Sequence, residues 1–204
     1  MIGLLACFFD SAAIAQDDKK EPMDISNGFY MRWGPVFPLG NYSLGQPYET
    51  GDEYGFYEGY FNAAKIGISC EIGSHIYTGP SFANKYLRVG IDITYLNLWF
   101  NPNDASDATN WYWFAGQKAG PILTLSIPGG VMFDFGFKLS PIVGLTNDTW
   151  GRHLNQEIIM NFKFHMLQLS MQYCLGKINY TDFNEHTNIV DIPTFRLLLG
   201  MKFD

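Results

Sequence analysis

The sequence predicts an all-β fold, an eight-stranded antiparallel up-and-down transmembrane β-barrel. Three observations lead to this prediction. Apolar and polar residues alternate with period two, long and short connections take turns, and aromatic residues (17 %) outnumber charged residues (16 %). Successive side chains of a strand point to opposite faces, so this alternation indicates strands rather than helices.

The alternation is clearest in residues 131–143. Phe133 and Phe135 share an apolar face there, whereas Asp134 and Lys138 share the opposite, polar face. A helix would mix these residues around its circumference. Six segments alternate in this way: 28–36, 64–76, 86–99, 117–127, 131–143 and 194–203.

Residues 157–175 alternate too, but the phase switches once. Apolar residues occupy even positions up to Phe164 and odd positions from Leu167 onward, with His165 and Met166 between them. Either a bulge in one long strand or a tight turn between two strands would account for the switch. The turn gives eight strands, an even number that bacterial barrels prefer, so we predict the turn.

The connections between these segments alternate in length. In an up-and-down barrel this alternation places all long loops at one end and all short turns at the other. We expect long loops at 38–60, 101–110, 147–155 and 179–191, and short ones at 79–85 and 128–130.

Alternation alone does not say which face points into the barrel. A lipocalin-like soluble barrel has an apolar interior, whereas a membrane barrel has an apolar exterior. Charges of both signs and recurrent glycines on the polar face favour a narrow, salt-bridged lumen. Aromatic residues near strand ends, among them Trp33, Trp99 and Trp113, favour a membrane interface. The predicted lumen charge network comprises Arg32, Lys65, Glu71, Arg88, Asp92, Lys118, Asp134, Lys138 and Arg196.

The last residues, FRLLLGMKF at 195–203, resemble the C-terminal strand of bacterial outer-membrane barrels, which the barrel assembly machinery reads. That signal usually closes on an aromatic residue, and here Asp204 follows Phe203. The layout resembles eight-stranded barrels of the outer-membrane protein A and X type, in a Tyr- and Gly-rich style similar to that of Bacteroidetes. The resemblance implies a Gram-negative outer membrane, with outer-membrane lipid and the assembly machinery as partners.

The N-terminus predicts an export signal over residues 1–15. Residues 2–9 are apolar, and Ala13-Ile14-Ala15 fits a small-x-small cleavage site. No basic residue precedes the apolar run, which a start codon placed too late would explain. We expect a short segment at 16–27 and the barrel at 28–204.

Composition excludes several classes of chemistry. The net charge is −7 without a basic stripe, so nucleic acid is not an expected partner. The three cysteines form no disulfide framework, and no CxxC or Cys/His cluster suggests a metal, so no cofactor is expected. His153 and His186 lie in predicted external loops near carboxylates, a pattern more typical of exposed loop histidines than of a catalytic group. The sequence therefore predicts no enzyme.

The first long loop is the most distinctive surface, because tyrosine and acidic residues dominate it. Tyrosine-rich loops make adaptable contact surfaces. We expect a structural or binding barrel whose external loops contact a protein, a glycan or a subunit of a larger envelope complex. A lipid-modifying enzyme and a soluble lipocalin-like ligand-binding barrel are the alternatives. The candidate binding residues are Tyr48, Asp52, Glu53, Tyr54 and Tyr57.

Overall fold

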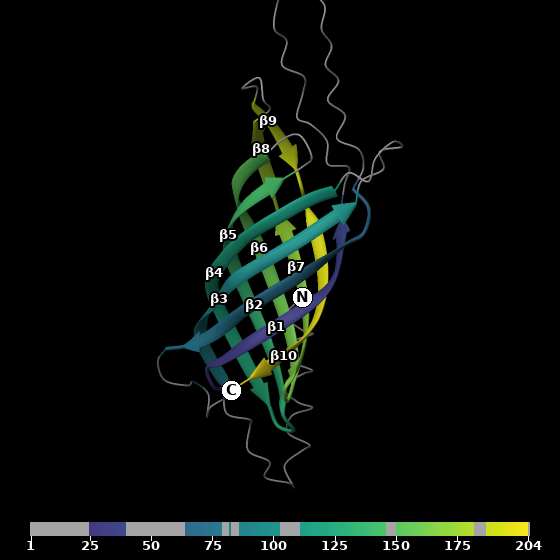
Figure 1. Cartoon of the computed structure of the whole chain (residues 1–204). Coiled ribbons are helices and arrows are strands. Elements are labelled where there is room, and N and C mark those ends of the chain that lie inside the picture. The colour runs from purple at the N-terminus through teal and green to yellow at the C-terminus, as the bar shows by residue number, and fades with distance from the viewer. Residues whose placement is uncertain are drawn as a thin grey trace, which may run out of the picture.

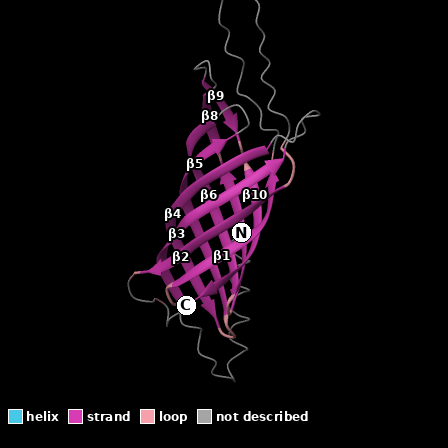
Figure 2. Cartoon of the chain, viewed as in Figure 1, coloured by secondary structure: helices cyan, strands magenta, loops and turns pink. Residues whose placement is uncertain are grey.

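The chain folds into antiparallel strands that wrap into a barrel (Figure 1). The structure is a computed structural model and describes residues 25–39, 64–78, 82, 86–102, 111–145, 150–181 and 187–203. Figure 2 shows only strands and connections in this part of the chain, and none of it forms a helix long and apolar enough to cross a membrane. The strands are β1 (Gly28–Pro38), β2 (Gly67–Tyr77), β3 (Leu87–Pro102), β4 (Trp111–Ile127), β5 (Val131–Leu145), β6 (Trp150–Phe164), β7 (Leu167–Leu175), β8 (Lys177–Thr181), β9 (Thr187–Asp191) and β10 (Thr194–Phe203).

Eight of these strands close the barrel. Each of β1 to β7 pairs with the next, except that β7 pairs with β10, and β10 pairs with β1 to complete the circuit. Because a closed barrel has no edge, every strand finds partners on both sides, as a bilayer requires. The prediction of an eight-stranded antiparallel barrel is confirmed.

The phase switch between β6 and β7 is a tight turn. Phe164 pairs with Leu167, which leaves His165 and Met166 as a two-residue connection. His165 has a φ of 52°, the left-handed conformation that such hairpin turns need. The predicted turn is therefore confirmed, and histidine is one of the few non-glycine residues that adopt this conformation comparatively often.

Parts of three predicted long loops are strands instead, and in two of them the strands take up most of the predicted loop. β3 continues to Pro102, β6 begins at Trp150, and the predicted loop 179–191 contains part of β8 and all of β9. The hairpin of β8 and β9 extends the barrel wall at one end, where β8 pairs with the start of β6 (Figure 1). A strand that lies beyond the lipid needs no apolar row, so the sequence carried no alternation to reveal it.

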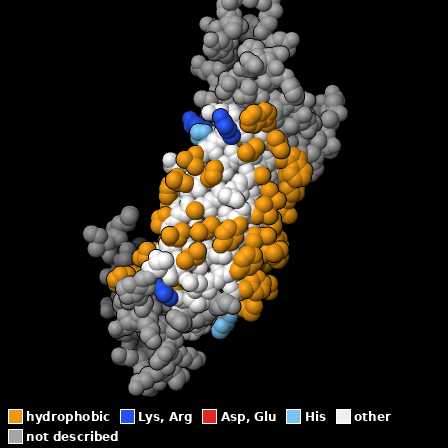
Figure 3. Space-filling view, turned by 60° about the vertical axis from the view of Figure 1, so that its left-hand side comes forward, with side chains coloured by type: hydrophobic (Ala, Val, Ile, Leu, Met, Phe, Trp, Pro, Cys, Tyr) orange, Lys and Arg blue, Asp and Glu red, His pale blue; other side chains and the backbone are white. Residues whose placement is uncertain are grey.

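The apolar face points outward. Phe135 and Leu199 are 46 % and 52 % exposed, whereas Arg32 and Arg196 on the opposite face are fully buried. Figure 3 shows hydrophobic side chains covering the visible wall, with basic side chains only toward its ends. This polarity is the reverse of a soluble barrel, so the lipocalin-like alternative is wrong. It is the polarity of a transmembrane barrel.

A bulge in β3 reverses the inward and outward sides of its second half. The register with β4 shifts between Thr94 and Asn97, and Tyr95 and Leu96 both point outward. Beyond the bulge the odd positions face inward, so Trp99 is only 1 % exposed. The expectation that Trp99 lies at the membrane interface is therefore wrong, because an extra residue in a strand inverts every later side chain.

One inward glycine makes room for an aromatic ring. A Cβ at Gly73 would overlap the Ile93 carbonyl oxygen and the phenol ring of Tyr30. At Gly136 the atom nearest to a Cβ would be the Pro121 carbonyl oxygen, at 3.2 Å, and the others lie at ordinary contact distance. We expect Gly73→Ala to lower the free energy of unfolding by about 1–3 kcal/mol through overpacking, and Gly136→Ala to lower it less. Urea unfolding in lipid vesicles measures the difference, and equal losses would contradict the assigned contact.

Candidate functional site

The lumen collects most of the charged residues predicted for it. Lys65 is an exception, because it precedes β2, where strand geometry no longer sets side-chain direction, and it is exposed. Arg88 is half-buried at the start of β3, and its guanidinium donates to the Ile25 carbonyl oxygen. The remaining predicted residues are all at most 1 % exposed: Arg32, Glu71, Asp92, Lys118, Asp134, Lys138 and Arg196.

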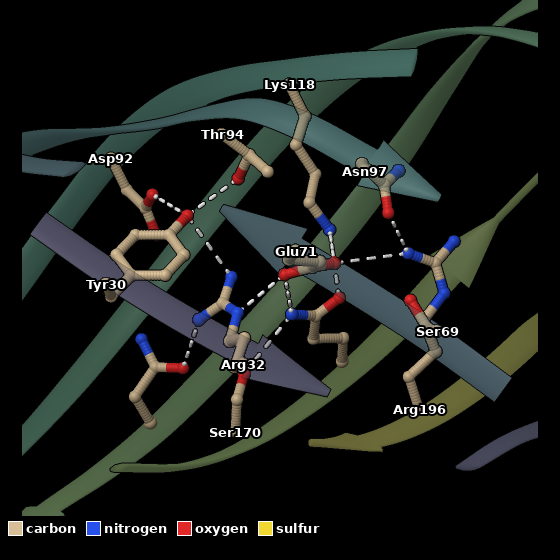
Figure 4. Close-up of polar contacts among 12 residues, drawn as sticks. Tyr30, Arg32, Ser69, Glu71, Asp92, Thr94, Asn97, Lys118, Ser170 and Arg196 are labelled. Carbon is tan, nitrogen blue, oxygen red and sulfur yellow. Dashed lines mark hydrogen bonds and ion pairs between the residues drawn. The ribbon is translucent and has the colours of Figure 1, made fainter. Parts of the chain in front are cut away.

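Glu71 of β2 is the centre of this network (Figure 4). The Arg32 Nε lies 2.5 Å from Glu71 Oε2, and the Lys118 ammonium contacts Glu71 Oε1. The Arg196 guanidinium approaches the same Oε1 at 3.4 Å, and the Gln172 amide donates to Oε2 at 2.9 Å. The single Glu71 carboxylate therefore forms ion pairs with three buried cations, each from a different strand.

Glu157 of β6 is a second buried carboxylate that the prediction omitted. Its Oε2 lies 2.6 Å from the Lys118 ammonium, and its Oε1 lies 3.6 Å from the Arg196 guanidinium. Glu71 and Glu157 thus share two cations across the lumen. The signal that could have found Glu157 was the outward phase of Phe162 and Phe164, which places the odd positions of β6 inside.

A second polar group lies closer to the turn end of the barrel. Lys138 and His75 approach Asp92 at 2.6 and 3.3 Å, and Lys163 approaches Asp134 at 2.6 Å. His75 Nδ1 also lies 3.1 Å from the Lys163 ammonium. Lys163, like Glu157, comes from β6 and was missed because the register of residues 157–175 was ambiguous in the sequence.

Apolar side chains close both ends of the lumen. Toward the β8–β9 hairpin, the indole of Trp99 stacks on Phe114 with ring centroids 4.6 Å apart, and Arg196 lies 4.0 Å above the indole. The cluster at this end consists of Val36, Trp99, Tyr112, Phe114, Ile142, Ile178 and Ile192. The cluster at the turn end consists of Ile25, Tyr77, Ile122 and Met132.

The residues just before β1 help to close the turn end. Ile25 is 2 % exposed, and the Lys202 ammonium donates to the Ser26 carbonyl oxygen at 3.2 Å. The Asn27 side chain accepts a hydrogen bond of 2.7 Å from the backbone N–H of Tyr77. The predicted short N-terminal segment therefore ends as a cap on the lumen, while residues 1–24 lie outside the described residues.

The described lumen is filled by its own side chains. Six buried cations and four buried carboxylates lie inside it, and eight strands leave room for little more than side chains. Buried ion pairs add little net stability, but loss of one partner leaves an uncompensated charge. The network therefore links strands on opposite sides of the lumen through buried ion pairs.

The described residues show no accessible catalytic arrangement. His75 contacts Asp92, but both are sealed in the lumen, and the described part of the chain has no group of His, Cys, Asp and Glu placed to hold a metal. His153, predicted in a loop, lies within β6, and His186 lies outside the described residues. The five candidate binding residues of the first long loop also lie outside them.

Comparison with known proteins adds three solved structures of low similarity. No protein-family model and no curated protein matches the sequence. Neisserial surface protein A is 13 % identical and covers 87 % of this chain and 97 % of its own, with a TM-score of 0.45. The attachment invasion locus protein Ail of Yersinia pestis is 12 % identical and covers 89 % of this chain and 100 % of its own, with a TM-score of 0.42. A complex of Ail with the heparin analogue sucrose octasulfate has a TM-score of 0.37.

These similarities are too low to assign a family or a ligand to the chain. The barrel wall itself is the stronger observation. A closed antiparallel circuit of eight strands leaves no unpaired strand edge in lipid, and its apolar exterior contacts the hydrocarbon while its charged side chains lie inside. On these features the chain is a β-barrel of the outer-membrane type.

Proposed function

We propose that this barrel is a non-conducting outer-membrane scaffold that binds a partner through its external end. The observation that carries the proposal is the filled lumen, in which Arg32, Glu71 and Arg196 are fully buried at the centre. A barrel without a water path does not serve as a pore. Its wall and its external end are then the surfaces left for function.

The external end is assigned by its connections. The two tightest turns, at 128–130 and at His165-Met166, lie at one end, whereas the long connections after β1 and β3 and the β8–β9 hairpin lie at the other. In outer-membrane barrels short turns are periplasmic and long loops are extracellular. The hairpin therefore extends the wall outside the cell, next to the loops predicted to bind a protein, a glycan or an envelope complex.

The absence of conduction is the first test. In planar lipid bilayers we expect the folded protein to produce no conductance steps above those of the empty membrane, because charged side chains fill the lumen. A porin serves as the positive control. Stable ohmic steps from folded, heat-modifiable protein would contradict the proposal.

Partner binding is tested by photo-crosslinking in living cells. A photoreactive amino acid replaces Tyr54 in the first long loop, and in a matched control it replaces Phe135 on the lipid face. We expect Tyr54 to give an adduct of defined mass with one envelope protein or glycan, and Phe135 to give only lipid adducts. The same adducts from both positions, or none from Tyr54, would argue against a binding role for the loop.

The lipid-modifying enzyme is a second candidate that no described arrangement favours. The His75–Asp92 pair, which could otherwise serve as a base with its orienting acid, lies inside the closed lumen. We therefore expect a deletion strain to retain the lipid A mass profile of its parent, and a change in that profile would support the enzyme.

The last strand, β10, has the pattern expected of a signal for assembly in the outer membrane. β10 alternates outward Phe195, Leu199 and Phe203 with inward Arg196 and Gly200 and closes the circuit against β1. This pattern supports recognition by the barrel assembly machinery. The strand count supports the protein A and X type, whereas the Bacteroidetes-like style rests on composition alone.

A further inference from the structure

A groove lies on the outer wall near the external end. It has a volume of about 530 Å³ and runs across β4, β5, β6 and β8. Small and apolar residues form much of the groove, and one edge is formed by the basic side chain of Arg152 and the amide side chain of Asn179. Its lining consists of Ala115, Gly116, Pro141, Ile142, Val143, Arg152, His153, Leu154 and Asn179.

The groove lies at the level of the outer lipid leaflet. Two exposed tryptophans, Trp113 and Trp150, lie just above it, where both pair with Leu145. Tryptophans facing lipid mark the membrane–water interface. Arg152 is the outward position of β6 that follows Trp150 in the direction of the membrane centre. Its side chain therefore lies close to the depth of the lipid headgroups.

Arg152 is unusual on this wall. Among the described outward positions of the eight barrel strands it is the one charged side chain, and no described carboxylate forms an ion pair with it. An unpaired charge facing lipid is unfavourable unless it lies near the interface and meets an opposite charge. Register places Arg152 between Val143 of β5 and Asn179 of β8, beside the apolar floor of the groove.

We propose that this groove binds one phosphorylated lipid of the outer leaflet. Arg152 pairs with the phosphate, because a guanidinium binds phosphate oxygens through two parallel hydrogen bonds. Asn179 adds a donor at the same edge, and an acyl chain lies over Ala115 and Pro141.

Charge and shape together favour a lipid over other occupants. The groove joins one positive edge to an apolar floor, which matches a molecule with a phosphate and a hydrocarbon chain. A second groove of about 450 Å³, at the turn end beside Phe29, Tyr95 and Phe203, has no outward charge among its described lining residues. We expect that groove to show no preference for phosphate.

The proposal is tested with the full barrel in phosphatidylcholine nanodiscs. Lipid A, or lipid A whose phosphates have been removed enzymatically, is titrated in, and native mass spectrometry measures the fraction of barrel that retains it. We expect dephosphorylation and Arg152→Gln each to weaken retention about tenfold, the loss of one charge-assisted contact. Lys65→Gln removes an exposed cation away from the groove and serves as the matched control.

A second variant separates the hydrocarbon contact from the charge. Ala115→Trp fills the floor and leaves Arg152 in place, so we expect it to weaken retention of both forms of lipid A. Heat-modifiable migration establishes that each variant is folded. Unchanged retention in Arg152→Gln, equal retention of both lipids by the natural protein, or equal competition by inorganic phosphate alone would overturn the proposal.

Discussion

Glu71→Gln is expected to lower the free energy of unfolding by about 3–5 kcal/mol, because it removes a fully buried carboxylate from its cationic partners. Arg32, Lys118 and Arg196 all contact this carboxylate, and Glu157 can compensate only the last two. Lys118 and Arg196 would then share the Glu157 carboxylate, and Arg32 would lose its ion-pair partner in a medium of low dielectric constant. Urea unfolding in lipid vesicles, followed by tryptophan fluorescence, measures the loss.

An exposed ion pair is the control for that experiment. Lys177 and Asp191 lie 3.4 Å apart on the external hairpin, with side chains 63 % and 56 % exposed. We expect Lys177→Gln to cost less than about 1 kcal/mol, since water screens exposed pairs. A double variant, Glu71→Gln with Arg32→Gln, should recover part of the stability because it removes the charge left unpaired. Losses of similar size in the Glu71 and Lys177 variants would contradict the central role of Glu71.

Phe135→Arg is expected to destabilise the folded barrel by about 2–4 kcal/mol, the cost of a basic side chain near the middle of a bilayer. Phe135 faces outward on β5, 46 % exposed, between Leu123 of β4 and Met160 of β6. The polar residues Gln117 and Gln156 that face outward lie further toward the external end, which places Phe135 inside the apolar band.

Position along the same strand supplies the control for Phe135. Leu145 ends β5 beside Trp113 and Trp150 at the external interface, so Leu145→Arg should cost about 0–1 kcal/mol. Phe135→Leu keeps the site apolar and should cost much less than Phe135→Arg. Vesicle unfolding in urea compares the three variants, and equal costs for arginine at the two positions would show that the wall does not cross the bilayer as described.

Period-two alternation was sufficient to predict the barrel because lipid imposes it. Most membrane-facing positions are apolar, so rows such as Phe133, Phe135 and Phe137 are visible in the sequence without knowledge of strand pairing. The even strand count of bacterial barrels then favoured the turn at His165-Met166 over a bulge. Both inferences depend on strands within the membrane, and the structure agrees with them there.

Structural features that the lipid does not constrain could not be predicted from the sequence. The β8–β9 hairpin lies beyond the apolar band, and its polar strands resemble a loop. The β3 bulge reverses the facing of later side chains without any turn residue to signal it, so Trp99 was predicted on the wrong face. Glu157 and Lys163 were missed because their contacts with Lys118 and Asp134 join strands far apart in sequence, and only closure of the barrel brings them together.

The central claim is that the apolar face contacts lipid and the charged face lines the lumen. Spin-label accessibility at Phe135→Cys, in a protein whose native cysteines are replaced by serine, tests this claim most directly. In lipid vesicles we predict strong relaxation of the label by oxygen, which dissolves in hydrocarbon, and weak relaxation by a water-soluble nickel chelate. Strong relaxation by the nickel chelate and weak relaxation by oxygen would contradict the account.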